Sequence, residues 1–211
     1  MAFVGKFKRK DYAKFFAHSI IMVFVVIEGD NGTGKDTLAK KLAESGYGII
    51  SYLPAVKERE KVARKSVDKT QAFLDYNNYC GNLVMEDNTP SIVIRYWIST
   101  LAAAYADHIY KYDKVIQLTD EIKKTMVVPN VVIRIWVGAE TRLNRIASRN
   151  ANNPELSDDV SIARSQRYEW ISKEILNRSG YRWREFDNTS ASVATLASEI
   201  LEYINGEVLN E

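Results

Sequence analysis

The sequence has few of the residues that mark secreted, metal-binding or membrane-embedded proteins. Its single cysteine, Cys80, excludes an intramolecular disulfide and favours a reducing, cytoplasmic location. The two histidines, His18 and His108, stand apart, and neither a metal-ligand cluster nor a nucleophile–histidine–acid set is recognisable. No apolar run is long enough to span a membrane, and we find no internal repeat or low-complexity segment. We therefore expect no membrane partner.

An excess of charge of one sign is also missing. The chain has 29 Lys and Arg against 27 Asp and Glu, a formal net charge of +2, so no nucleic-acid partner is expected. Basic residues near the start precede an apolar run at Ile20–Ile27, which resembles a signal peptide. That run leads into a glycine-rich loop, however, and not into a small-residue cleavage site. We expect residues 1–21 to be an extension and residues 22–211 to form a single domain.

The glycine-rich loop gives the strongest functional signal. An apolar strand at Val23–Ile27 precedes it, and Leu38, Ala39 and Leu42 follow it at helical spacing. A strand, a glycine-rich turn and a helix amino terminus together form a cradle in which backbone N–H groups and the helix dipole attract phosphate. We therefore expect a nucleotide to be bound by these nine residues: Gly29, Asp30, Asn31, Gly32, Thr33, Gly34, Lys35, Asp36 and Thr37.

The spacing Gly29-x4-Gly34-Lys35 fits the P-loop pattern, in which the lysine holds the β- and γ-phosphates. The pattern ends differently here, because Asp36 stands where Ser or Thr is usual and Thr37 comes one position later. The loop identifies a nucleotide-binding site but does not tell what the nucleotide is used for.

Short apolar runs alternate with helical patterns along the chain. We expect strands at 23–27, 48–53, 92–94, 131–137 and 181–186. Helical spacing predicts one helix from Ile98 to Tyr112, a helix from 158 to 177 with Trp170 facing inward, and a last helix that stops near Gly206. This alternation predicts an α/β fold, a five-stranded parallel sheet with helices on both faces and right-handed crossovers.

Several segments, in this order, resemble the thymidylate kinases within the P-loop nucleoside monophosphate kinases. They are the opening strand and P-loop at 24–37, Ile94-Arg95-Tyr96 with Ser99 beyond it, the strand at 131–137 with the Arg145-x3-Arg149 spacing that follows, Arg164–Tyr168, and Phe186–Thr189. The resemblance covers the chain from about residue 23 to its end. Only the P-loop is highly specific alone; the other segments gain weight from their order.

The resemblance implies transfer of the ATP γ-phosphate to a deoxynucleoside monophosphate, foremost dTMP, with Mg²⁺. It also implies a 2-3-1-4-5 strand order, a small lid at about 142–158 and a homodimer. Lys35, Arg95, Arg145 and Arg149 would be the catalytic residues, with Arg142 as a further candidate. Arginine suits this role because its planar guanidinium binds phosphate oxygens in pairs.

Four positions depart from the family pattern. Asn31 replaces an acid, Asp36 a serine or threonine, Ile94 an aspartate, and Asn77 stands near the usual place of an arginine that holds the acceptor phosphate. The site loses a carboxylate at Ile94 and gains one at Asp36. Because Mg²⁺ prefers carboxylate oxygens, we expect Asp36, with Thr37, on the metal side of the site.

Two other functions stay open. A deoxynucleoside kinase that phosphorylates a hydroxyl would need a carboxylate base, for which Glu28 and Asp75 are the candidates. A nucleotide-binding regulatory protein with a kinase fold and weak or absent catalysis would explain the altered metal-side residues, although Lys35, Arg95, Arg145 and Arg149 are all retained.

Overall fold

The structure is a computed structural model that describes residues 22–87, 89–152 and 162–208. Its strands are β1 (Phe24–Glu28), β2 (Gly48–Ile49), β3 (Ser91–Ile94), β4 (Val131–Trp136) and β5 (Trp183–Asp187). Its α-helices are α1 (Lys35–Ala43), α2 (Pro54–Lys65), α3 (Lys69–Asp87), α4 (Trp97–Ala106), α5 (Tyr112–Ile122), α6 (Ala139–Asn152), α7 (Ile162–Ser179) and α8 (Val193–Val208), and a short 3-10 helix, η2, spans Ile50–Tyr52. The predicted extension at 1–21 and part of the predicted lid, 153–158, lie outside the described residues.

The strands form one parallel sheet in the order β2-β3-β1-β4-β5, as predicted. β1 lies at the centre, where both of its faces are covered and every residue is buried, which explains the apolar run from Phe24 to Ile27. The glycine-rich loop follows β1 and Arg95 follows β3, its neighbour. Both therefore stand at the carboxyl edge of the sheet, where open α/β folds place their ligands.

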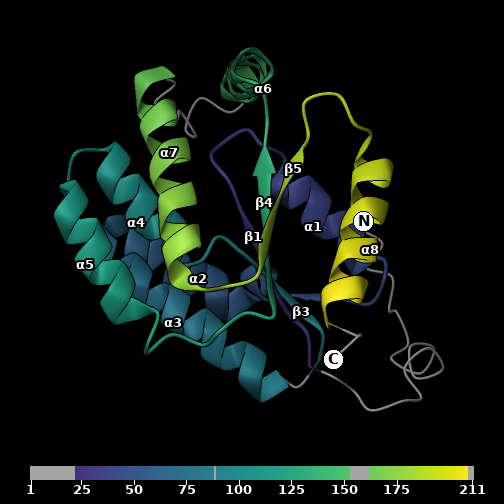
Figure 1. The fold of residues 1–211 in the computed structure, drawn as a ribbon, viewed down its shortest axis with the longest axis horizontal. Coiled ribbons are helices and arrows are strands. Elements are labelled where there is room, and N and C mark those ends of the chain that lie inside the picture. The colour runs from purple at the N-terminus through teal and green to yellow at the C-terminus, as the bar shows by residue number, and fades with distance from the viewer. Residues whose placement is uncertain (1–21, 88, 153–161, 209–211) are drawn as a thin grey trace.

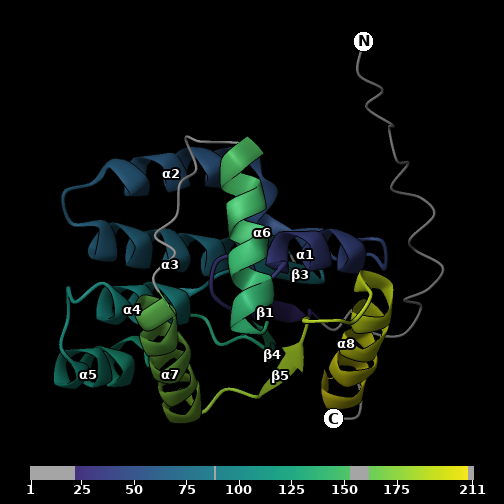
Figure 2. The same cartoon turned by 90° about the horizontal axis from the view of Figure 1, so that it is seen from above.

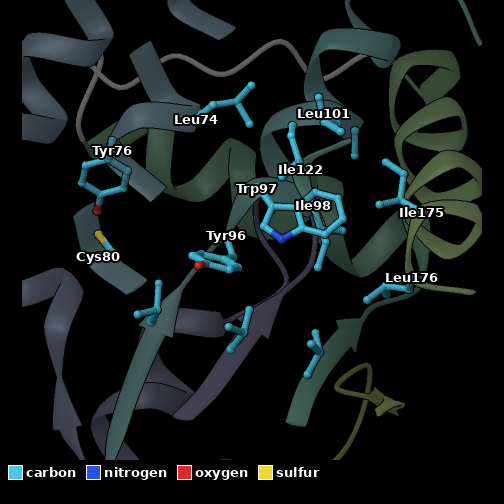
Figure 3. Close-up of a cluster of buried hydrophobic side chains, with 14 of the residues drawn as sticks. Leu74, Tyr76, Cys80, Tyr96, Trp97, Ile98, Leu101, Ile122, Ile175 and Leu176 are labelled. Atoms are coloured by element: carbon cyan, nitrogen blue, oxygen red, sulfur yellow. The ribbon is translucent and has the colours of Figure 1, made fainter. Parts of the chain in front are cut away.

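Helices cover the two faces of the sheet unequally (Figures 1 and 2). One face packs on α3, α4 and α7, with α2 and α5 further out, and its core includes Tyr96, Trp97 and Ile175 (Figure 3). The other face packs on α1 and α8 through residues such as Leu38 and Ile200. α6 lies across the carboxyl end of the sheet, beyond the tip of β4 (Figure 1). This helix therefore stands over the edge that carries the glycine-rich loop.

A fully buried arginine anchors α7 to the sheet. Arg134 on β4 is 0% exposed, and its guanidinium is paired with Glu169 of α7 and Glu185 of β5. Its Nε also donates to Ser172 Oγ of α7, at 3.3 Å. A buried charge is tolerated only when it is paired in this way, so these contacts fix α7 against β4 and β5.

The second strand is shorter than predicted. β2 ends at Ile49 instead of Leu53, because the chain turns into η2 and the Ser51 hydroxyl, not a strand carbonyl, accepts the Ile94 N–H at 2.9 Å. Pro54 then begins α2 instead of ending a strand, a position where its missing N–H costs no hydrogen bond. The turn at η2 brings Tyr52 toward α1.

Several helix boundaries, and the position of one tryptophan, also differ from what the sequence predicts. The predicted helix from Ile98 to Tyr112 ends at Ala106, where His108 adopts a φ of 58°, and Ile109 is 58% exposed. Trp170 was predicted to face inward but is 51% exposed and packs on the rings of Tyr105 and Tyr112. The last helix runs through Gly206. Residues 142–152 of the predicted lid belong to α6.

Candidate active site

The glycine-rich loop takes the backbone conformation that its glycines allow. Gly29, Gly32 and Gly34 have φ values of 140°, 80° and 90°, which L-residues with a side chain rarely adopt. A Cβ on Gly32 would lie 2.9 Å from Ile146 of α6, so this glycine also lets α6 approach the loop closely. The loop leads directly into the amino terminus of α1, as a phosphate cradle requires.

Lys35 begins α1 and is 4% exposed. Its ammonium donates to the backbone oxygen of Asp30 at 2.5 Å and to Thr33 Oγ1 at 3.2 Å, so it lies within the loop itself. Burial, and secondarily the nearby Arg95 charge, lower the pKa of Lys35 from 10.5 to about 7. The ammonium is thus held by neutral oxygens that an anionic ligand would replace.

Arg95 extends from the end of β3 toward the loop. It has a φ of 65°, a left-handed conformation that is unfavourable for a residue with a Cβ, and its N–H donates to Ile27 O at 2.9 Å. This turn directs the guanidinium to the loop, where Nη2 donates to the side-chain oxygen of Asn31. Unusual backbone geometry of this kind is concentrated at functional sites. Lys35 and Arg95 therefore lie close together at the carboxyl edge of the sheet.

Glu28, the last residue of β1, is the hub of a buried hydrogen-bond network. Its Oε1 accepts the Tyr96 N–H at 2.9 Å, and its Oε2 accepts the Ser99 hydroxyl. The Ser99 hydroxyl lies 2.9 Å from that of Tyr168 on α7, which donates to Gly29 O at 3.4 Å. Burial raises the pKa of Glu28. The network links the loop to α4 and α7.

Asp36 is exposed and faces η2. Tyr52 donates its hydroxyl to Asp36 Oδ1 at 3.0 Å, and the tyrosine ring lies between Lys40 and Lys57, whose Nζ atoms are 5.8 and 5.1 Å from its centroid. Sequence reasoning missed Tyr52, because it was assigned to a strand whose true end is Ile49. The Tyr52 hydroxyl holds the Asp36 carboxylate beside the amino terminus of α1.

The three arginines of α6 differ in their surroundings. Arg145 donates from Nη2 to the backbone oxygen of Asn188 at 2.9 Å, and the Asn188 amide donates to Thr33 O at 2.8 Å. Arg149 stands one turn beyond Arg145. Arg142 is 4% exposed and donates to the carboxylate of Asp30 at 2.7 Å. Arg145 and Arg142 thus have contacts that lead to the loop.

The remaining candidates lie in two places. Asn77 is 1% exposed, and its side-chain oxygen accepts the Thr100 hydroxyl at 2.8 Å. Asp75 lies on the other side of α3, where its carboxylate accepts the Gln71 amide at 2.9 Å and lines a hollow of about 320 Å³ shared with α5. That hollow contains no residue of the glycine-rich loop.

The donor set for a magnesium ion is small. In the described ranges, no group of three or more His, Cys, Asp and Glu residues could hold a metal ion. Mg²⁺ in phosphoryl-transfer sites is bound by one or two carboxylates together with substrate phosphates and water, so it needs no such cluster. The exposed Asp36 carboxylate, fixed by Tyr52 at the end of the loop, fits that pattern.

Comparison with known proteins gives similarity in structure but not in sequence. No protein-family model and no curated protein matches the chain. A deoxyadenosine kinase from M. mycoides, solved with its products dCMP and dCDP, is 18% identical with a TM-score of 0.59, over 87% of this chain and 100% of that one. The same kinase with bound dATP gives 16% and 0.59, over the same shares of the two chains.

The YorR protein from Bacillus subtilis, solved with phosphorylated GDP, is 17% identical with a TM-score of 0.53, over 87% of this chain and 96% of that one. Together these similarities show that the chain has the fold of P-loop nucleoside kinases. None of the helices in the described ranges has the length and apolar character needed to cross a membrane.

Proposed function

We propose that the protein is an ATP-dependent kinase of deoxynucleoside monophosphates, foremost dTMP. One observation carries the proposal: the guanidinium of Arg95 reaches from β3 to Asn31 of the loop that holds Lys35. Two cationic side chains at the carboxyl edge of the sheet suit the transfer of a phosphoryl group between two phosphates, because this reaction depends on positioning and positive charge. The solved kinases of this fold, with nucleotides bound, support a nucleotide-using kinase and leave the acceptor open.

The residues divide the work as follows. The loop, Gly29 to Thr37, and Lys35 bind the β- and γ-phosphates of ATP. Arg95 binds the transferred group and the acceptor phosphate. Arg145 and Arg149 approach the phosphates from α6, and Arg145 is held there by its contact with Asn188. A phosphate acceptor is already anionic, so the reaction needs no base to remove a proton from it.

This last point separates the proposal from a kinase that phosphorylates a hydroxyl. Neither candidate base is available for that reaction in this structure. The Glu28 oxygens accept hydrogen bonds from Tyr96 and Ser99, and Asp75 lies on the α5 side of α3, away from the glycine-rich loop. The similarity to a deoxyadenosine kinase nevertheless favours hydroxyl phosphorylation as the second candidate. In that reaction Glu28 would have to release Ser99 to act as base.

The first test is ADP release from ATP and Mg²⁺ with a panel of acceptors. The panel contains dTMP, dUMP, dCMP, dAMP and dGMP, the ribonucleotides, and the nucleosides deoxyadenosine, deoxycytidine and thymidine. We expect the highest kcat/KM with dTMP. Preference for another monophosphate would support the same mechanism with a different acceptor. Turnover of nucleosides alone would instead establish a kinase that phosphorylates a hydroxyl. ATP binding without turnover of any acceptor would establish a regulatory protein.

Mg²⁺ would be held by Asp36, with Thr37 beside it, and would neutralise charge on the β- and γ-phosphates when bound. Replacing Asp36 by asparagine keeps an oxygen but removes the charge, so we expect the Mg²⁺ concentration for half-maximal turnover to rise about tenfold. Mn²⁺ binding to the protein–ATP complex, followed by electron paramagnetic resonance, should weaken in parallel. Tyr52→Phe should produce a smaller shift in the same direction.

The matched control for this variant is Asp113→Asn. Asp113 is, like Asp36, an exposed acid in the first turn of a helix, so both substitutions change the helix dipole interaction equally. It lies on α5, away from the loop, and should leave the Mg²⁺ requirement unchanged. If Asp36→Asn behaves like the control, Asp36 is not a metal ligand.

A further inference from the structure

The second residue of the glycine-rich loop has a side chain that points to the helices and not to the phosphate cradle. The carboxylate of Asp30 is 2% exposed. Its Oδ2 accepts hydrogen bonds from Arg142 at 2.7 Å and from the Ser165 hydroxyl at 3.0 Å. Its Oδ1 accepts the Asn31 N–H at 2.8 Å and lies 3.5 Å from Arg164 Nη1. One carboxylate thus contacts both α6 and α7.

These two helices follow each other in the chain and stand on either side of residues 153–161. Arg142 comes from the first turns of α6, and Arg164 and Ser165 from the first turn of α7. The Asp30 carboxylate is therefore tied to the base of both segments that lead into the expected lid. Figure 2 shows α6 extending over the loop region, with the amino-terminal end of α7 nearby.

Other contacts make the same connection independently of Asp30. Gly32 allows α6 to lie against the loop, since an added Cβ would meet Ile146 and Arg142 at 2.9 and 3.2 Å. Arg164 also donates from Nε to Asp107 at 2.6 Å, where α4 ends. The loop therefore packs directly on α6 without Asp30, whereas the charged contact between α7 and the loop is made through Asp30, and Asp107 holds Arg164 to α4.

Arg142 and Asp30 form a buried ion pair. The Arg142 side chain is 5% exposed, and Asp30 is the carboxylate paired with it. Removal of one partner of such a pair leaves the other charge buried and uncompensated, which is far more costly than losing an exposed pair. Without the Asp30 charge, Arg142 would have to move, and it would displace α6 and Arg145 with it.

We propose that Asp30 is a positioning residue that sets α6 and α7, and with them Arg145 and Arg149, relative to the phosphates bound in the loop. In this proposal, which rests on the proposed function, Arg142 and Arg164 are anchors and do not bind phosphate. Occupation of the loop by ATP fixes the backbone around Asp30 and so orders both helices for transfer. The loop thereby senses the nucleotide and transmits its presence to the arginines of α6.

The test is the nearly isosteric variant Asp30→Asn, measured for kinetics and for amide hydrogen exchange. We expect kcat to fall about 10- to 100-fold, because misplacement of catalytic arginines by about 1 Å has effects of this size, while KM for the acceptor changes little. Amide exchange should accelerate in α6 and in the first turns of α7, and ATP should slow it much less than in the unaltered protein.

Two further variants separate positioning from simple destabilisation. Asp107→Asn removes the same charge from a partner of the same Arg164 but does not touch the loop, and it should leave kcat and the exchange of α6 unchanged. Adding Arg142→Met to Asp30→Asn removes the stranded charge and should restore part of the lost kcat. Ser165→Ala, which deletes one hydrogen bond to Asp30, should give a milder form of the same pattern if Asp30→Asn does not fold.

The proposal is overturned if Asp30→Asn lowers the melting temperature without changing kcat per folded molecule or the exchange of α6 and α7. It is also overturned if ATP protects these helices equally in both proteins. The kcat comparison needs an acceptor, whereas the exchange and ATP-protection measurements do not. If no acceptor is turned over, the exchange and ATP-binding measurements still decide the role of Asp30 by themselves.

Discussion

Replacing Lys35 by methionine should lower kcat/KM about 10³-fold, the upper end of what removal of one preorganised donor costs. Methionine fills a similar volume within the loop but cannot neutralise phosphate charge. In the free protein, within the described part of the chain, the ammonium donates to two neutral oxygens, Asp30 O and Thr33 Oγ1, so the loop should keep its shape in the variant. Steady-state kinetics at varied ATP would measure the loss.

Lys41→Met is the control for the loss of a lysine from α1. Lys41 pairs with Glu44 at the surface and should contribute little, so its kcat/KM should stay within about twofold of the unaltered protein. If Lys35→Met loses less than about tenfold in kcat/KM, the loop does not bind the reacting phosphates in the way proposed.

The pKa of Lys35 adds a second expectation to the same residue. In the free protein this pKa is lowered to about 7, so at pH 8 most molecules carry a neutral amine. Bound phosphates favour the charged form and raise the pKa again, so ATP binding at pH 8 should take up close to one proton. Calorimetry in two buffers of different ionisation enthalpy measures this uptake.

The uptake should vanish in Lys35→Met and should fall as the pH is lowered through 7, because the free amine is then already protonated. The affinity for ATP should correspondingly decrease as the pH rises above 7, by at most tenfold per pH unit for a single proton. Equal proton uptake by the unaltered protein and by Lys35→Met would exclude Lys35 as the source.

Replacing Arg95 by methionine should lower kcat about 10³-fold, while the dissociation constant for ATP changes little. An arginine that stabilises the transferred phosphoryl group contributes about 10³ to 10⁵ in kcat. Arg95 is placed for this role by its left-handed turn after β3 and by its contact with Asn31. Arg95→Lys should recover only part of the rate, because an ammonium lacks the planar pair of donors.

Separate measurement of ATP binding is what makes this prediction specific. If Arg95 merely supported the loop, its loss would weaken ATP binding and lower the melting temperature together with kcat. Arg184→Met is the control, because Arg184 lies over the rings of Phe186 and Tyr203 on β5 and α8, and its replacement should leave kcat unchanged. An Arg95→Met variant within tenfold of the original kcat would contradict the assignment.

Much of the fold could be predicted because its central strands are buried on both faces. β1, β3 and β4 therefore read as mainly apolar runs, and the glycines between β1 and α1 define the loop by themselves. The predicted end of β2 was wrong because Ile50 and Leu53 are apolar residues of the kind that strands contain. The contact that ends the strand, Ser51 with the Ile94 N–H, joins residues 43 apart.

The side-chain environment of the site could be predicted only in part. Lys35 and Arg95 follow from their places after β1 and β3, since the carboxyl ends of neighbouring parallel strands lie side by side. The role of Asp30 could not be predicted, because Arg142 and Ser165 are 112 and 135 residues away and no local pattern pairs them. The prediction that Trp170 faces inward was wrong for a related reason. Helical spacing shows that Trp170 lies on an apolar face of α7, but it does not show that this part of the face packs on other aromatic rings at the surface.

The long-range contacts of the loop also affect when nucleotide binding can arise during synthesis. The loop occupies residues 29–37, yet the contacts that brace it come from Arg142, Ser165 and Asn188, up to 155 residues later. A ribosome delivers β1 and the loop first and the groups that hold them last. A nascent chain therefore exposes the central strand of the sheet, and an unbraced loop after it, until nearly the whole domain has emerged. ATP cannot assist the early steps of folding and acts as a ligand only of the finished domain.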